Sequence, residues 1–278
     1  MSPIATAVWL DGRLVASDAA WVSAFDHGLT VGDGVFETLR VYGGVPFALR
    51  RHLDRLGRSA AGLGLALPDR SLLERACAEV VEAGGGGDAR LRLTVTGGPG
   101  PLGSARGPGG PTVLAAVAPL AATSPAAAVA VAPWPRNERG ALAGLKTTSY
   151  AENVVLLAWA RERGAEEAVV TDTTGRLCEG TGANVFVVHG GRVRTPALSS
   201  GCLAGVTREL VLERTGAEEA ELDLDDLAGA DEAFLTSSTR EVQPIASVDG
   251  RALPAAPGPC TSAAAADFRA LVESDLDP

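Results

Sequence analysis

Lysine is almost absent from this chain of 278 residues, in which 24 residues are lysine or arginine and only Lys146 is lysine. Acidic residues outnumber basic ones by 34 to 24, which gives a formal net charge of −10. Nucleic acids and anionic membranes are bound by clustered lysine and arginine, so this balance argues against both as partners. A small anionic ligand is still compatible with it, because a local arginine can bind one.

Cysteine, histidine and long apolar runs are also scarce. The four cysteines show no close pairing and so do not form a disulfide framework. Together with the three histidines they lack the spacing of metal ligands. No stretch of about 18 apolar residues is present to cross a membrane, and the first residues lack the charged and apolar regions of a secretion signal. We therefore expect a cytoplasmic protein that binds no metal.

The single lysine is informative because arginine supplies every other basic side chain of this kind. Such a bias is typical of a GC-rich coding sequence that exchanges lysine for arginine wherever only charge is needed. Arginine can replace lysine in an ion pair, but it cannot form an imine, and its pKa is too high for it to shuttle protons. Lys146 is therefore a candidate Schiff-base residue, for which only a primary amine will do. The alternative is that one lysine survived by chance.

Turn residues and alternating patterns predict an α+β arrangement in the first half of the chain. Asp11-Gly12 between two short apolar runs indicates a hairpin. The other predicted elements of this half are strands over 35–42 and 89–96 and helices over 50–63 and about 71–84.

Residues 97–110 are predicted to form a loop of glycine and proline. Gly98, Gly100 and Gly103 match the spacing of a dinucleotide-binding motif, but that motif must open a helix. Prolines between and after these glycines prevent a helix here, so a flexible loop is the better interpretation.

Small residues and prolines over 118–128 indicate a domain boundary. We therefore expect one domain over 1–120 and a second over 121–278. In the second domain we predict helices over 150–163, 207–214 and 263–273, two strand pairs within 167–195, and a strand over 232–237.

Three further patterns fit a lysine that holds an aldehyde cofactor. Glu179 stands in a glycine-flanked turn before an apolar run, where a carboxylate could keep a pyridine nitrogen protonated. Thr207 stands at the start of a predicted helix, and residues 236–239 end a strand with four hydroxyl groups; both suit a phosphate. Taken singly, these are equally a surface glutamate, a plain helix cap and a polar turn. Together with the single lysine they indicate pyridoxal phosphate.

The sequence resembles the class IV aminotransferase family, pyridoxal-phosphate enzymes of fold type IV. The segments that carry the resemblance are FDHGLTVGDGVFETLRVYGGVPF (25–47), RRHLDRL (50–56), GLKTTSYAEN (144–153), CEGTGANVF (178–186), SSGCLAGVTR (199–208) and DEAFLTSSTREVQPI (231–245). The resemblance implies a smaller N-terminal α/β sandwich and a larger C-terminal domain that contains a β-barrel, with the cofactor between them. It also implies a homodimer in which each site borrows loops from the neighbouring subunit.

The resemblance further implies which residues bind the cofactor. They are Lys146 for the Schiff base, Glu179 for the pyridine nitrogen, Tyr150 near the 3′-oxygen, Asn184 beneath the ring as a support for Glu179, and Arg55, Val206, Thr207 and Ser238 for the phosphate.

The cofactor residues do not distinguish between reactions, because the same set serves both lyases and aminotransferases. The segments 25–47 and 89–98 resemble the branch of 4-amino-4-deoxychorismate lyase, and we predict that reaction, which releases pyruvate and 4-aminobenzoate. The alternatives are an aminotransferase acting on branched-chain or D-amino acids and, more remotely, a non-catalytic binding protein of the same fold. Arg92 and Arg106 are candidate ligands of a substrate carboxylate. Val31 stands where many relatives carry an aromatic residue that lines the substrate side.

Overall fold

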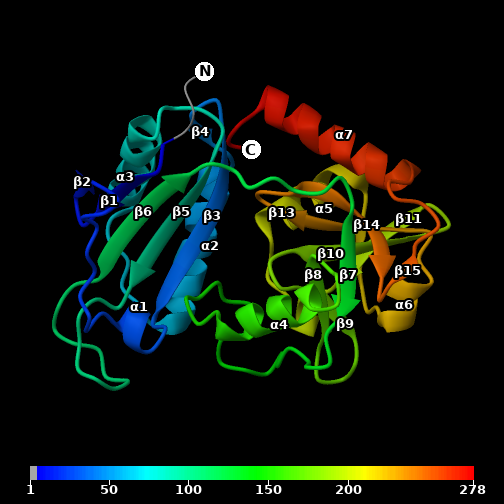
Figure 1. The fold of residues 1–278 in the computed structure, drawn as a ribbon, viewed down its shortest axis with the longest axis horizontal. Helices are drawn as coiled ribbons and strands as arrows, with labels where there is room; N and C mark the ends of the chain where they lie inside the picture. The colour runs from blue at the N-terminus through cyan, green and yellow to red at the C-terminus, as the bar shows by residue number, and fades with distance from the viewer. Residues whose placement is uncertain (1–4) are drawn as a thin grey trace. The chain divides into compact units, whose positions relative to one another are not determined.

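The computed structural model describes residues 5–278; the first four residues, part of the stretch in which no secretion signal is expected, lie outside it (Figure 1). The described chain forms two compact units. Unit 1 contains the described residues up to Ala121 together with Leu145–Tyr150 and Asp275–Pro278, and unit 2 contains the rest. We call Leu145–Tyr150 the lysine segment. The two units are thus interleaved along the chain rather than separated by a single cut after residue 120.

Unit 1 is built on a six-stranded sheet in which all neighbouring strands run antiparallel. In spatial order its strands are β2 (Arg13–Val15), β1 (Ala7–Leu10), β6 (Thr112–Ala118), β5 (Ala89–Thr96), β3 (Gly34–Tyr42) and β4 (Val45–Pro46). Its helices are α1 (His27–Thr30), α2 (Leu49–Leu63) and α3 (Arg70–Ala83). The predicted hairpin is confirmed, because β1 pairs with β2 across Asp11 and Gly12, whose φ angles are +44° and +97°.

Helices α2 and α3 pack against the sheet of unit 1, α2 on β3 and α3 on β1, β5 and β6. Alternation along β3 therefore decides which of its side chains are covered. Val35 and Leu39 are fully buried in one apolar cluster with Leu56 of α2 and Cys77 of α3. Glu37 lies between Val35 and Leu39 in the strand and is 0% exposed, so a carboxyl group occupies a position of the apolar row.

Unit 2 is built on a nine-stranded sheet. Its strands are β7 (Ala127–Val131), β8 (Glu167–Thr171), β9 (Leu177–Gly180), β10 (Asn184–His189), β11 (Arg192–Pro196), β12 (Glu218–Ala220), β13 (Glu232–Ser237), β14 (Glu241–Val248) and β15 (Arg251–Ala252). Its helices are α4 (Ala151–Arg161), the short 3₁₀ helix Leu198–Ser200, α5 (Val206–Thr215), α6 (Leu224–Ala228) and α7 (Pro259–Ser274).

The sheet of unit 2 is mixed and curled. Its main order is β12-β11-β10-β13-β14-β7-β8-β9, with β15 paired to β14. Strands β14, β7 and β8 run parallel to one another. Strand β9, at one end of this order, also approaches β10, so the sheet bends back on itself as a barrel does. Phe186 of β10 and Phe234 of β13, which pair across the two strands, stack with ring centroids 4.8 Å apart. The predicted α+β class is confirmed.

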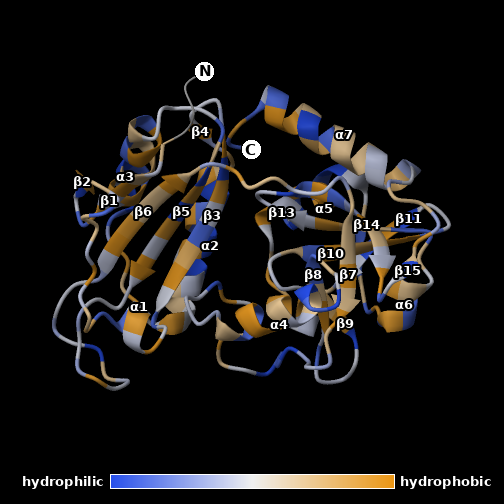
Figure 2. Cartoon of the chain, viewed as in Figure 1, coloured by the Kyte–Doolittle hydropathy of each residue, from blue (hydrophilic) through white to orange (hydrophobic). Residues whose placement is uncertain are grey.

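Strands β6, β7 and β14 are not predicted from the sequence. Strand β7 begins at Ala127, inside the small-residue stretch that we interpret as a boundary, and it is apolar on both faces. Strand β14 contains Pro244, which cannot donate a ladder hydrogen bond and obscures the strand pattern. Figure 2 shows the apolar residues along β5, β6 and β7. Within residues 5–278 no helix is both long enough and apolar enough to cross a membrane.

Candidate active site

The lysine segment lies against β3 of unit 1 as a short additional strand. The Phe36 N–H donates to the Lys146 carbonyl oxygen (3.1 Å), and the Thr148 N–H donates to the Gly34 carbonyl oxygen (2.8 Å). The Lys146 N–H donates to Ser59 Oγ of α2 (3.0 Å). The main chain of Lys146 is thus held by a strand and by a helix, which fixes the position from which its side chain starts.

Two aromatic rings lie beside the Lys146 amine. Nζ is 4.4 Å from the ring centroid of Phe36 and 5.9 Å from that of Tyr150, and the two rings meet edge to face. Cζ of Arg92, on β5, is 3.7 Å from the Phe36 centroid. Because cations are attracted to the faces of aromatic rings, the ring of Phe36 contacts both a primary amine and a guanidinium. The structure therefore brings together three predicted residues, Lys146, Tyr150 and Arg92.

The turn before β3 also supports the lysine segment. The Gly32 carbonyl oxygen accepts hydrogen bonds from Thr148 Oγ1 (2.8 Å) and Ser149 Oγ (3.0 Å). Gly32 has a φ of +70°, and a Cβ there would lie 2.6 Å from Ser149 Oγ, so this position requires glycine. Val31, immediately before the turn, is 44% exposed, which leaves its side chain accessible to a ligand or to another chain.

Arg55 lies in a buried polar cluster between β3 and α2. Its Nε donates to Glu37 Oε1 (2.8 Å) and its Nη2 to Glu37 Oε2 (2.6 Å), and His52 Nδ1 also lies 2.6 Å from that second oxygen. Burial by itself would raise the pKa of Glu37, but Arg55 and then His52 outweigh it and hold that pKa well below its usual value. Burial lowers the pKa of His52, so we assign a neutral ring that donates its Nδ1–H to the carboxylate.

Arg106 anchors the predicted loop 97–110 to the rest of unit 1. Its Nε and Nη2 donate to the two carboxylate oxygens of Asp33, at 2.7 Å each, and it also donates to the carbonyl oxygens of Leu63 and Gly64 at the end of α2. The two hydrogen bonds from Arg106 to Asp33 hold the pKa of this carboxyl group below its ordinary value of 3.8. Of the two arginines predicted to meet a substrate carboxylate, Arg92 is thus the one that contacts the same ring as the lysine amine.

Glu179 lies on β9 of unit 2 between two donors. Its Oε2 accepts the Leu203 N–H (3.0 Å), and its Oε1 lies 3.6 Å from Nη2 of Arg136. Nη1 of Arg136 donates in turn to Glu152 Oε2 (2.8 Å). The carboxylate of Glu179 is therefore held between an amide and a guanidinium. Sequence analysis missed Arg136, because only folding brings it to Glu179.

The predicted phosphate ligands of unit 2 include the first two residues of α5. Val206 and Thr207 are both buried, and the residue before them, Gly205, has no side chain that could accept the N–H groups of the first turn. A Cβ on Gly205 would overlap Asn184 Oδ1. Asn184 Nδ2 donates to the Leu203 carbonyl oxygen (2.9 Å), so Asn184 is tied to the chain that leads into α5. The start of this ten-residue helix therefore offers main-chain donors to an anion.

Hydroxyl groups gather where β13 ends. Ser237 Oγ accepts the Arg240 N–H (3.2 Å), which closes the turn that contains Ser238. Thr236 pairs with Asn184 across β13 and β10, and its buried Oγ1 has no hydrogen-bond partner among the described residues. This end of β13 therefore lies next to the strand that carries Asn184 and presents hydroxyl groups suited to phosphate oxygens.

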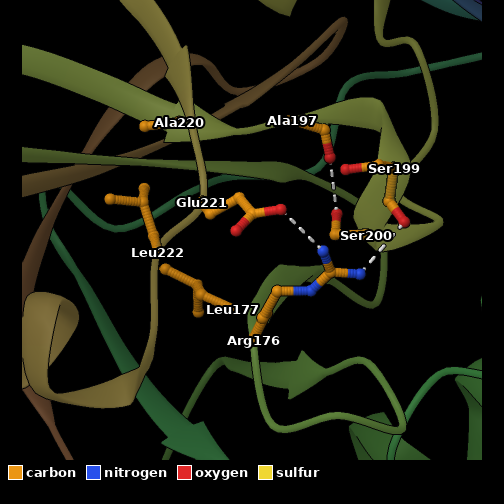
Figure 3. A pocket seen from close by; sticks show the side chains of 8 residues that line it. All are labelled: Arg176, Leu177, Ala197, Ser199, Ser200, Ala220, Glu221 and Leu222. Atoms are coloured by element: carbon orange, nitrogen blue, oxygen red, sulfur yellow. Dashed lines mark hydrogen bonds and ion pairs between the residues drawn. The ribbon is translucent and has the colours of Figure 1, made fainter.

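A small pocket elsewhere in unit 2 is not this site (Figure 3). It is a shallow hollow that leaves almost no room for a water molecule, and it is lined by Arg176, Leu177, Ala197, Ser199, Ser200, Ala220, Glu221 and Leu222. Arg176 donates across it to Glu221 Oε1 (3.0 Å) and to the Ser199 carbonyl oxygen (3.4 Å). Its polar groups thus pair with one another, and none of the residues predicted for the cofactor or the substrate lines it.

Thiol and metal chemistry receive no support from the geometry. All four cysteines are free thiols. Burial raises the pKa of Cys202 to about 11 and that of Cys178 further, so both thiols stay protonated and poorly nucleophilic at neutral pH. In the described part of the chain, no group of three or more histidine, cysteine, aspartate or glutamate side chains is arranged to hold a metal ion.

The donors found in the two units suit pyridoxal phosphate. Taken by itself, unit 1 contains a primary amine, which could react with an aldehyde, and a buried guanidinium; unit 2 contains a carboxylate, which could pair with a ring nitrogen, and an uncapped helix start. A guanidinium, main-chain N–H groups and hydroxyls are the donors that bind phosphate in proteins. The residues present therefore fit the cofactor that the sequence indicates.

Comparisons with known proteins agree with this donor set. The model of the family described as amino-transferase class IV matches residues 34–248. A D-alanine aminotransferase of Bacillus licheniformis is 34% identical over 263 residues, which cover 91% of this chain and 93% of that protein. A branched-chain-amino-acid aminotransferase of Salmonella typhimurium is 31% identical over 263 residues, which cover 87% of this chain and 85% of that protein. The crystal structure of a branched-chain aminotransferase from Thermoproteus uzoniensis with norvaline superposes with a TM-score of 0.89 at 33% sequence identity. The superposition covers 96% of this chain and 95% of that one.

Proposed function

This chain belongs to the class IV aminotransferase family, whose cofactor is pyridoxal phosphate, and we propose that it transfers the amino group of branched-chain amino acids. The sequence-based preference for 4-amino-4-deoxychorismate lyase finds no support, since the relatives are aminotransferases named for branched-chain amino acids or D-alanine. The observation that carries the proposal is the Lys146 amine, held against the rings of Phe36 and Tyr150, with Arg92 in contact with the same Phe36 ring.

Lys146 is the reactive group of the proposed mechanism. When bound, pyridoxal phosphate supplies an aldehyde that condenses with amines and a ring that withdraws electrons from the substrate. Lys146 is the chain's single lysine, and its main chain is anchored to Phe36 and Ser59. Its Nζ acts as the general base that removes a proton from the substrate α-carbon.

The other predicted residues hold the cofactor. Glu179 would keep the ring nitrogen of a bound cofactor protonated, and Arg136 and the Leu203 N–H hold the Glu179 carboxylate in place. The remaining roles follow the resemblance: Tyr150 at the 3′-oxygen, Asn184 beneath the ring, and Arg55, Val206, Thr207 and Ser238 at the phosphate.

The surroundings of Lys146 favour an aliphatic amino acid. Arg92 contacts the same ring as Lys146, and its guanidinium can form a bidentate pair with a substrate carboxylate. The edge-to-face rings of Phe36 and Tyr150 offer an apolar surface beside Lys146. Such a surface suits a branched hydrocarbon side chain better than a second carboxylate.

A homodimer is also part of the proposal. Large apolar side chains of unit 1 are exposed in the single chain: Trp21 (81%), Phe25 (54%), Leu29 (70%), Val31 (44%) and Leu102 (78%). Exposed apolar residues that gather on neighbouring segments are typical of interaction surfaces. Light scattering of the purified protein tests this, and a monomeric mass at micromolar concentration would refute it. The cytoplasmic location stays a prediction.

A substrate panel tests the reaction. The purified protein is incubated with L- and D-amino acids, each with 2-oxoglutarate or pyruvate, and separately with aminodeoxychorismate. We expect 2-oxo acids from L-valine, L-leucine and L-isoleucine. Oxo acids from D-amino acids alone would instead place the protein with the D-alanine aminotransferase relative, and 4-aminobenzoate formation without transamination would establish the lyase.

A further inference from the structure

A carboxylate buried in an apolar row needs an explanation. Glu37 is 0% exposed on the face of β3 that otherwise packs Val35 and Leu39 against the helices. Burying an ion pair costs several kcal/mol of desolvation for each charge, and apolar residues of similar size are often at least as stabilising. The charge of Glu37 is therefore better explained by its effect on Arg55, with which it pairs, than by a contribution to folding stability.

The partner of Glu37 is held in one orientation. Arg55 uses one edge of its guanidinium, Nε and Nη2, in a two-point contact with both oxygens of Glu37. A guanidinium is planar and rigid, so fixing one edge fixes the direction of the remaining nitrogen, Nη1. His52 fixes the carboxylate from its other side through Nδ1, at 2.6 Å.

This cluster is linked to the lysine segment. Ser59, which binds the Lys146 N–H, lies one helical turn beyond Arg55 on α2, so both project from the same side of the helix. The positive charge of Lys146 also contributes to the lowered pKa of His52, which places that charge within electrostatic reach of the cluster. Arg55 is thus oriented within the part of unit 1 that holds the reactive amine.

We propose that Glu37 is a positioning residue which, together with His52, fixes the guanidinium plane of Arg55 so that its Nη1 edge binds the cofactor phosphate. This inference rests on the phosphate role of Arg55 in the proposed function. Because Glu37 already neutralises Arg55, the arginine recognises the phosphate by the direction of its N–H groups rather than by net charge.

Two effects oppose each other when Glu37 loses its charge. Removing a nearby negative charge would strengthen the binding of an anion if Coulomb attraction dominated. Losing the two-point contact would weaken it, because Arg55 would then have to be ordered when the phosphate binds. If Glu37 positions Arg55, the second effect is the larger and phosphate binding weakens. The direction in which phosphate binding changes therefore decides between the two effects.

The experiment compares cofactors with and without the phosphate. Apoprotein of each variant is titrated with pyridoxal phosphate and with pyridoxal. The dissociation constant for pyridoxal divided by that for pyridoxal phosphate is a ratio that measures phosphate recognition alone. We expect Glu37→Gln to lower this ratio about tenfold, the size of one charge-assisted hydrogen bond, with pyridoxal affinity unchanged. Arg55→Gln should lower the ratio at least as much, and the double variant should lower it no further than Arg55→Gln.

Controls separate positioning from a general loss of structure. Glu79, whose Oε2 accepts the Trp9 Nε1–H at 2.7 Å, is a carboxylate of the same unit away from Arg55, and Glu79→Gln should leave the ratio unchanged. If Glu37→Gln folds poorly, His52→Phe should still lower the ratio, and the ³¹P resonance of the bound cofactor should shift in it but not in Glu79→Gln.

The outcomes distinguish the two proposals. A ratio that is unchanged or raised in Glu37→Gln, while Arg55→Gln lowers it, would overturn the positioning role of Glu37 and leave the proposed function intact. Equal weakening of both cofactors in Glu37→Gln would likewise show a structural role only. A ratio that Arg55→Gln does not change would overturn the phosphate role of Arg55 itself, and the positioning role with it.

Discussion

Replacing Arg106 by glutamine should loosen the loop 97–110 and destabilise unit 1. Arg106 makes a bidentate pair with Asp33 and donates to two carbonyl oxygens at the end of α2. Its side chain is 33% exposed and that of Asp33 is 12% exposed, so the pair is neither fully screened nor fully buried. An exposed pair contributes up to about 1 kcal/mol, and each net hydrogen bond about 0.5–1.5 kcal/mol. We therefore expect Arg106→Gln to lower the free energy of unfolding by about 2 kcal/mol.

The pH dependence of this loss identifies its cause. In the folded protein, Arg106 holds the pKa of Asp33 below its ordinary value of 3.8. The stabilisation from this pair is therefore present above the unfolded pKa and is lost as the pH falls through the folded pKa, when Asp33 becomes protonated. The difference between the native protein and Arg106→Gln should narrow on acidification below the usual pKa of aspartate.

Urea unfolding at neutral and acidic pH, with amide hydrogen exchange of residues 97–110, measures both effects. Arg70→Gln is the matched control, because Arg70 also forms ion pairs within unit 1, with Asp54 and Glu74, but is 45% exposed. We expect it to cost less than about 1 kcal/mol. An Arg106→Gln protein as stable as the native one, or equally weakened at every pH, would refute the reasoning.

Three substitutions probe the site directly. Lys146→Ala should yield a colourless protein that retains no cofactor after dialysis and forms no oxo acid; a yellow, active variant would contradict the role of Lys146. Arg92→Gln should raise KM for amino acids by about tenfold or more, the size of a lost charge-assisted pair, with a smaller change in kcat; an unaltered KM in steady-state assays would remove Arg92 from the site. Gly205→Ala should displace the Asn184 side chain and weaken pyridoxal phosphate binding, which a fluorescence titration can measure.

Elements with a strong local signal are predictable from this sequence. The hairpin at Asp11-Gly12 and the long helix α2 follow from turn chemistry and from helical periodicity. The strands β7 and β14 are not predicted, because one lies in a run of small residues and the other contains Pro244. Such strands are stabilised by their neighbours in the sheet, and those neighbours are distant in sequence.

Arg136 shows where sequence reasoning about the site ends. Nothing local to it indicates a partner, yet in the fold its guanidinium lies 3.6 Å from Glu179. Glu37 is similar, because an alternating strand with one acidic residue on its apolar face gives no hint of the arginine and histidine that α2 brings to it. Both contacts join residues that are separated in the sequence and meet only after the chain has folded.

Chemical identity came from the amino acids alone: a single primary amine, a glutamate among glycines and a threonine opening a helix indicate the cofactor. Reactive groups must be of particular residue types, and residue types are visible without a structure. Tertiary structure decided which of the two predicted arginines shares a contact with that amine, since Arg92 meets the same ring as Lys146 while Arg106 is bound to Asp33. It also revealed the carboxylate that orients Arg55, because orientation depends on distances that only the packed chain defines.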